Sequence, residues 1–147
     1  AERVQFEIAT NPGQPFGPLT KLASGGELSR FMLALKVVLA RLDTAETLIF
    51  DEVDTGVGGA TADAVGERLA RLGAERQILV VTHAPQVAAR ARRHFRVSKA
   101  AEGGKAIVRI EELSADERRE EIARMLAGAA VTDAAREAAT SLLQEAG

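Results

Sequence analysis

The sequence contains no cysteine, no tryptophan and no tyrosine, so phenylalanine is its only large aromatic residue. Without cysteine, disulfides and thiolate metal sites are excluded, as is typical of proteins in a reducing compartment. With 5 phenylalanines in 147 residues, aliphatic side chains must fill the core, and stacking platforms for single-stranded nucleic acid are not expected. No apolar run reaches about 18 residues and nothing resembles a signal peptide, so we expect a cytoplasmic protein with no membrane partner.

Neither sign of charge dominates, because 21 acidic residues face 19 Lys and Arg, for a net charge of −2. The whole chain therefore has no general attraction for nucleic acid, and any such contact needs a local patch or further parts of the protein. One basic cluster consists of Arg90, Arg92, Arg93, His94 and Arg96. It suits either contact with DNA phosphates or the solvated end of a short helix, and the second interpretation is favoured.

Hydrophobic patterning predicts an α/β fold with a mainly parallel sheet flanked by helices. Alternation over residues 4–8 indicates a half-buried strand, a loop rich in proline and glycine follows over 10–23, and helical spacing predicts an amphipathic helix over 25–42. The continuous apolar runs are typical of strands covered on both faces. The further predicted elements are strands 47–50 and 77–82, a helix at 60–72, a short helix from Pro85 to about Arg93, and a hairpin of 95–99 with 106–113. Ser114, with Glu117 three residues on, is predicted to cap a helix over 115–126, and Thr132 starts a final helix that ends near Ala146.

The start of the first helix has a phosphate-binding pattern. Ser24, Gly25 and Gly26 place a hydroxyl and accessible backbone amides at a helix N-terminus, where the helix dipole favours negative charge. Glu27 follows Ser24 by three positions, as a capping box requires. Alone, this segment is also consistent with an ordinary helix start.

Two acidic residues and a histidine follow the two apolar strands. Asp51 and Glu52 end the first strand, and His83 follows the second, so parallel pairing would bring all three to the carboxyl edge of the sheet. Adjacent acids point in different directions there, so that one suits Mg²⁺ and the other suits activation of a water. An isolated acidic pair or a lone histidine is more often an ordinary strand end, but their combination with Ser24 favours a nucleotide site.

These motifs together resemble those of ATP-binding-cassette ATPases. Residues 22–30 are similar to the signature motif, 47–52 to Walker B with its catalytic glutamate, 53–58 to the D-loop, and Thr82-His83 to the switch histidine. Within that superfamily, the sequence over most of residues 20–128 is similar to that of the RecN family of bacterial DNA repair proteins. The resemblance implies a P-loop NTPase-like head of the kind found in Structural Maintenance of Chromosomes (SMC) proteins, in which two heads close around two ATP molecules.

The resemblance also implies a role for each motif residue. Asp51 would support Mg²⁺, Glu52 would polarise the attacking water, and His83 would contact the γ-phosphate. The residues facing ATP held by the second head would be Ser24, Gly25, Gly26 and Glu27, with Asp54 in the D-loop segment that crosses to that head. Catalysis of this kind depends on positioning and electrostatic stabilisation of the transferred phosphoryl group.

One motif of the superfamily is absent from the chain. No Gly-x-x-x-x-Gly-Lys-Ser/Thr sequence occurs, and Gly103-Gly104-Lys105-Ala106 lacks both the spacing and the hydroxyl. In the family that the chain resembles this motif lies in an N-terminal lobe, so the resemblance implies that residues 1–147 form the C-terminal half of a split head. Its expected partners are the N-terminal Walker A lobe of the same protein, a second head, and DNA through the complete protein in the nucleoid. We expect the fragment alone to be inactive as an ATPase.

Two departures from the superfamily pattern bear on the alternatives. Glu27 replaces the glutamine common in transporters, which favours the chromosome and repair branch over a transporter nucleotide-binding subunit. Gly58 replaces the aspartate that commonly ends the D-loop, so the usual contact there would be lost or supplied by Asp54. A non-catalytic head-dimerisation module is a further alternative, against which the retained Asp51, Glu52 and His83 argue.

Overall fold

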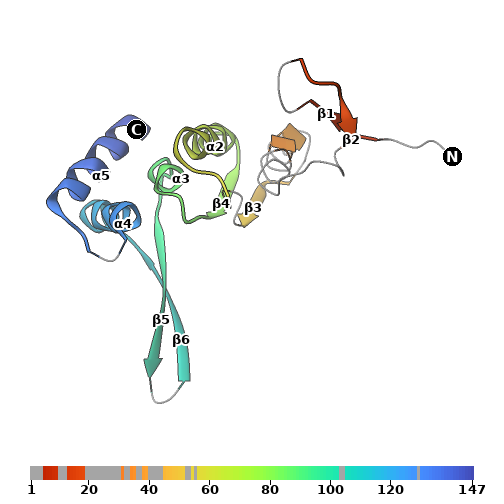
Figure 1. Cartoon of the computed structure of the whole chain (residues 1–147). Coiled ribbons are helices and arrows are strands. Elements are labelled where there is room, and N and C mark those ends of the chain that lie inside the picture. The colour runs from red at the N-terminus through yellow and green to blue at the C-terminus, as the bar shows by residue number, and fades with distance from the viewer. Residues whose placement is uncertain are drawn as a thin grey trace.

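The computed structural model describes residues 5–9, 13–18, 31, 34–35, 38–39, 45–51, 54, 56–102, 105–128 and 130–147 (Figure 1). Its elements follow in the order β1 (Glu7–Ile8), β2 (Gly17–Pro18), β3 (Thr47–Asp51), α2 (Gly59–Leu72), β4 (Gln77–Val81), α3 (Pro85–Ala89), β5 (Phe95–Glu102), β6 (Lys105–Glu112), α4 (Ala115–Ala127) and α5 (Asp133–Ala146). In Figure 1 the β5–β6 hairpin extends away from the helices, while α4 and α5 pack together. The mixture of strands and helices confirms the predicted α/β class.

Strands β3 and β4 form the predicted parallel pair. They are in register from Thr47 opposite Gln77 to Asp51 opposite Val81, with α2 as the connection between them. Apolar residues three or four positions apart on α2 turn one side of the helix toward the strands. These residues are Ala62, Val65, Leu69 and Leu72, all of them buried. The β-α-β unit predicted from the sequence is therefore confirmed.

The two faces of this strand pair differ in burial. On one face Phe50 is buried in the cluster that contains the α2 residues. On the other face Ile49 is 70% exposed and Val81 is 51% exposed. Successive side chains of a strand point to opposite faces, so a helix on one side covers only every second residue. The prediction that both strands are covered on both faces is wrong for the described part of the chain.

Helix α3 is shorter than predicted: it ends at Ala89 rather than near Arg93. The pairing of β5 with β6 explains the early end. The Leu113 N–H donates to the His94 carbonyl at 2.9 Å, and Arg93 Nε donates to Glu112 Oε1 at 2.6 Å. The chain is thus drawn into an antiparallel ladder directly after the helix, and the predicted hairpin is confirmed.

The hairpin has one polar and one apolar face. Val97 lies directly opposite Ile110 in the ladder, and these side chains are 63% and 68% exposed. On the opposite face Arg96 and Glu111 form an ion pair of 3.1 Å. The described residues therefore leave the apolar face of β5–β6 uncovered.

Helix α4 begins at the predicted cap, Ser114, and α5 begins after Thr132, where the sequence predicts the start of a helix. The Ser114 hydroxyl oxygen accepts a bond from the Glu117 N–H at 3.4 Å, and the Glu117 carboxylate accepts one from the Ser114 N–H at 2.9 Å. The Thr132 hydroxyl oxygen accepts a bond from the Ala135 N–H at 3.2 Å. Both helices pack against α3 around a second buried cluster, which consists of Ala88, Ala89, Ile122, Ala123 and Ala139.

The N-terminal residues form a small antiparallel pair. Ile8 of β1 lies opposite Gly17 of β2, so β1 occupies the end of the predicted strand 4–8 and β2 lies inside the predicted loop. The ring of Phe6 contacts that of Phe31 edge-on, with 6.3 Å between centroids. Residues 31, 34–35 and 38–39 are helical, in agreement with the helix predicted over 25–42. Among the helices described, none combines the length and apolarity needed to cross a membrane.

Candidate functional site

Three of the predicted site residues lie in the described part of the chain. They are Asp51, Asp54 and His83. The others lie outside the described residues; they are Ser24, Gly25, Gly26, Glu27 and Glu52. The geometry of the site is therefore the geometry of the segments that follow β3 and β4.

These two segments emerge at the same edge of the strand pair. Asp51 is the last residue of β3 and lies opposite Val81, the last residue of β4. His83 comes two residues later. Because the strands are parallel and in register, the predicted convergence of Asp51 and His83 on the carboxyl edge is confirmed, and ligands of open α/β sheets bind at this edge.

The carboxylate of Asp51 is available at this edge. The residue is exposed and belongs to the open face of the strand pair, together with Ile49 and Val81. Within the described residues, no group of three or more potential metal ligands gathers. A single exposed carboxylate still fits Mg²⁺, because this ion keeps several waters and usually takes one or two carboxylates in addition to substrate phosphates.

Asp54 has the most specific environment at the edge. It is only 5% exposed, and its Oδ2 accepts bonds from the Thr82 hydroxyl, from the His83 N–H at 3.2 Å and from the Ala84 N–H at 2.9 Å. The Thr82 oxygen in turn accepts a bond from the Ala84 N–H at 3.0 Å. A buried charge requires such partners, and hydrogen bonds to a carboxylate are stronger than bonds between neutral groups. We call Asp54, Thr82, His83 and Ala84 with these bonds the Asp54 network.

The carboxylate of Asp54 is directed into its own chain. Its place in a D-loop segment that crosses to a second head, which the family resemblance implies, stays a prediction. The segment after β4 leads into helix α3, whose N-cap residue, Ala84, has no polar side chain that could cap the helix. The N–H groups of His83 and Ala84, which precede the helix, bond to Asp54 instead. The side chain binds the loop of His83 instead of facing outward.

His83 itself is exposed at the edge, although its N–H is held by Asp54. Pro85 follows as the first residue of α3, where its fixed backbone angle suits a helix start. The imidazole is therefore presented on a loop whose backbone is anchored on both sides. Such an arrangement suits a group that must meet a ligand at a defined position.

The basic cluster is largely neutralised by acidic partners. Arg90 bonds Asp63 at 2.8 Å, Arg96 pairs with Glu111, and Arg93 pairs with Glu112. The hydrogen bond to Glu112 raises the pKa of Arg93 and lowers that of Glu112. These pairs favour a structural and solvated role over contact with DNA phosphates.

A second buried carboxylate escaped sequence reasoning. Glu121 of α4 is 7% exposed and accepts bonds from Arg124 Nε at 3.1 and 3.2 Å, which lower its pKa. Beside it, burial and the charge of Arg118 lower the pKa of His94. In the sequence Glu121 is one of several acids on a helix with few apolar residues, and no local pattern marks it as buried.

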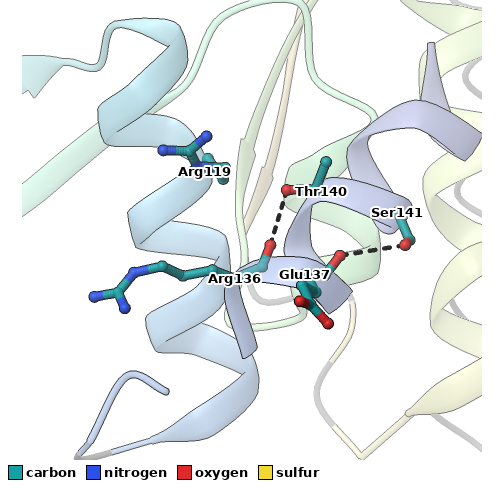
Figure 2. A pocket seen from close by; sticks show the side chains of 5 residues that line it. All are labelled: Arg119, Arg136, Glu137, Thr140 and Ser141. Carbon is teal, nitrogen blue, oxygen red and sulfur yellow. Dashed lines mark hydrogen bonds between the residues drawn. The ribbon is translucent and has the colours of Figure 1, made fainter. Parts of the chain in front are cut away.

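A shallow pocket lies away from this edge, between α4 and α5, and is shown in Figure 2. Its hydroxyls are already used, because Thr140 donates to the Arg136 carbonyl at 2.8 Å and Ser141 donates to the Glu137 carbonyl at 3.2 Å. Arg136 pairs with Glu120, also at 2.8 Å. Both hydroxyls of the pocket are therefore engaged within α5 and Arg136 is paired, so the strand edge remains the candidate site.

Comparison with known proteins identifies close sequence relatives. The chain is 57% identical over 145 residues to a DNA repair protein RecN of Xylella fastidiosa, covering 99% of the chain and 26% of that protein. It is 52% identical to the RecN of Deinococcus radiodurans over 95% of the chain and 24% of that protein. For the RecN of Bacillus subtilis the values are 45%, 97% and 25%. The chain spans about a quarter of the length of these relatives, and it matches no protein-family model.

Solved structures with a similar fold are heads of SMC proteins. The Smc head domain with a coiled coil and joint from Pyrococcus yayanosii has a TM-score of 0.63, 24% identity, and coverage of 75% of this chain and 20% of that one. A structure from work on ATP-driven dimerization and DNA-stimulated activation of SMC ATPases also has a TM-score of 0.63, with 19% identity over 80% of this chain and 70% of that one. By sequence the chain is thus similar to a segment of RecN-type DNA repair proteins, and its fold is similar to that of part of an SMC head.

Proposed function

We propose that this chain supplies one side of an ATP-hydrolysing head in an SMC-like DNA repair protein, with ATP bound between two heads. The proposal is carried by the parallel pairing of β3 and β4, which puts Asp51 and the segment of His83 at one carboxyl edge, in a chain whose sequence relatives are RecN proteins. The DNA repair role follows from the names of those relatives. That relationship also speaks against a transporter subunit.

The residues at the edge divide the work of phosphoryl transfer. Asp51 would hold Mg²⁺ through water, Glu52 would polarise the attacking water, and His83 would contact the γ-phosphate. Bound Mg²⁺ supplies positive charge that neutralises the phosphate oxygens. The chain's own contribution is the fixed position of these groups, because positioned charge accounts for most of the catalysis in this reaction class.

The helix start of residues 24–27 belongs to the other half of the interface. Ser24 and the amides near Gly25 and Gly26 contact ATP bound by the second head, and Glu27 caps the helix that presents them. The phosphate-binding loop comes from the N-terminal lobe, and DNA is contacted by the complete protein in the nucleoid. The 147-residue chain alone is expected to hydrolyse no ATP, and measurable turnover without that lobe would refute this division.

A glutamate pair provides a matched test in the complete protein that contains this chain. We expect Glu52→Gln to lower ATP hydrolysis by at least about 100-fold while ATP-bound dimers accumulate, because a general base contributes on this scale. Light scattering after size-exclusion chromatography measures the dimers. The control is Glu46→Gln, the same change at an exposed position just before β3, where activity should be retained.

Three outcomes of this test are informative. Unchanged hydrolysis in Glu52→Gln would contradict the role of that residue as the base. No hydrolysis in the parent protein, with dimers still forming, would instead support a non-catalytic dimerisation module. Equal losses in both variants would show that the effect is not specific to the carboxyl edge.

A further inference from the structure

The Asp54 network joins two segments that are distant in sequence but adjacent at the edge of the strand pair. Asp54 follows β3, and its bonding partners, residues 82–84, follow β4. Asp54 also begins a turn, because its carbonyl accepts a bond from the Val57 N–H at 3.0 Å. One buried residue therefore fixes the chain after both strands.

All three donors to Asp54 belong to the short loop that carries His83. Two of them are backbone N–H groups, so the carboxylate constrains the path of the main chain as well as one side chain. No positively charged side chain is needed to hold Asp54, because the hydroxyl and the amides supply its hydrogen bonds. A carboxylate placed in this way is specific to the conformation of the loop.

We propose that Asp54 is a positioning residue that acts through His83 and sets the place of the imidazole at the carboxyl edge. This inference rests on the proposed function and assigns Asp54 no contact with ATP. Because an error of about 1 Å in the position of a reacting group costs up to about 100-fold in rate, releasing the loop has a kinetic effect. A displacement of Asp54 is transmitted to His83 by the shared hydrogen bonds.

The first test is a double-mutant cycle in the complete protein. Asp54→Ala is expected to lower kcat for ATP hydrolysis by about 10-fold to 100-fold with little change in KM. In a His83→Ala background the same change should have no further effect on kcat, because the group being positioned is absent. Equal losses in both backgrounds would overturn the inference, since a merely structural role does not depend on His83.

Milder variants keep the test valid if Asp54→Ala fails to fold. Asp54→Asn retains one acceptor oxygen and should lose less activity than the alanine variant. Thr82→Val removes the hydroxyl, which donates to Asp54 and accepts from the Ala84 N–H, and should also give a partial loss. The matched control is Asp63→Ala, which removes a carboxylate that bonds Arg90 away from the loop and should leave kcat unchanged. Loss of activity in Asp63→Ala equal to that in Asp54→Ala would count against the inference.

A second measurement separates this inference from the proposed function. NMR of the complete protein, with the His83 signals assigned by a His83→Gln variant, reports the imidazole shifts and the amide exchange rate without any turnover. Asp54→Ala should change both, while Asp63→Ala should change neither. If the parent protein proves inactive, the proposed function fails but this result still decides the inference. Unchanged His83 signals in Asp54→Ala would overturn it.

Discussion

Two buried carboxylates occupy different parts of the molecule and are held in different ways. Asp54 lies at the strand edge and bonds donors 28 to 30 positions away in the chain. Glu121 lies on α4 and bonds Arg124, three positions along the same helix. The first fixes one segment relative to another, whereas the second stabilises the helix to which it already belongs.

This difference separates a region where geometry matters for activity from one where packing matters for stability. Substitutions at the strand edge are expected to change rate more than unfolding free energy. Substitutions in α4 and α5 are expected to do the reverse. Four changes test this division, and they are described in order of decreasing effect.

The largest effect on stability is expected for Ile122→Ala. Ile122 of α4 is completely buried. Truncating such a side chain lowers the free energy of unfolding by about 2–5 kcal/mol. Urea unfolding of the complete protein, followed by circular dichroism, measures the loss. Val97→Ala is the control, because Val97 is 63% exposed and should cost much less. A loss of kcat in folded Ile122→Ala protein as large as in Asp54→Ala would break the division between the two regions.

Gly66→Ala tests the packing of α2 against α3 beneath the strand edge. An added Cβ would lie 3.0 Å from Arg90 Cδ and 3.2 Å from both the Gln86 carbonyl oxygen and Val87 Cα, so the backbone of α3 would have to shift by a few tenths of an ångström. Overpacking of this kind costs about 1–3 kcal/mol. Thermal unfolding should show a lower Tm for this variant. The same change at Gly58, where a Cβ meets nothing within 4 Å, should lower Tm far less.

Ser114→Ala tests the polar stabilisation of α4. The change removes half of the capping box with Glu117 and should cost about 1 kcal/mol. Ser141→Ala is the matched control, because that hydroxyl bonds a carbonyl inside α5 and alanine is the better helix former. Equal destabilisation in both variants, measured by urea unfolding, would show that the cap contributes nothing of its own.

The smallest effect is expected for Glu121→Gln and depends on pH. The hydrogen bond from Arg124, aided by the charges of Arg124, Arg96 and His94, lowers the pKa of Glu121 below its usual 4.5. The ionised form therefore adds stability above pH 4.5 that is lost as the pH falls through the lowered pKa. Because Arg124 is 58% exposed, we expect less than about 1 kcal/mol.

The measurement for Glu121→Gln is urea unfolding at several pH values. As the pH falls below 4.5, the free energy of unfolding of the variant should approach that of the parent, whereas at neutral pH it should be slightly lower. Glu145→Gln, at an exposed position near the end of α5, serves as the control. A difference from the parent that stays constant across the whole range would show that ionisation of Glu121 is not the cause.

The sequence predicts well those features that depend on neighbouring residues. The cap at Ser114, the helix start at Thr132 and the apolar runs of β3 and β4 are local signals, and each is confirmed. The convergence of Asp51 with His83 was also predictable, because it follows from parallel pairing alone. The chemical roles of the site residues stay predictions.

Features that depend on distant contacts were not predictable in this way. The inward direction of Asp54 requires a partner loop 28 to 30 positions away, so the sequence around it reads only as an acid in a turn. The early end of α3 depends on pairing between His94 and Leu113. A continuous apolar run also does not indicate whether one face of a strand is covered or both, as the exposed Ile49 of β3 shows.

The uncovered apolar surfaces have a consequence for production of the protein. Ile49 and Val81 on the strand pair, with Val97 and Ile110 on the hairpin, present β-branched side chains on extended backbone to solvent. Such surfaces favour association with other chains. Made alone in a cell, the segment would be prone to aggregation and recognition by chaperones. Its yield in soluble form thus depends on whether these surfaces become covered.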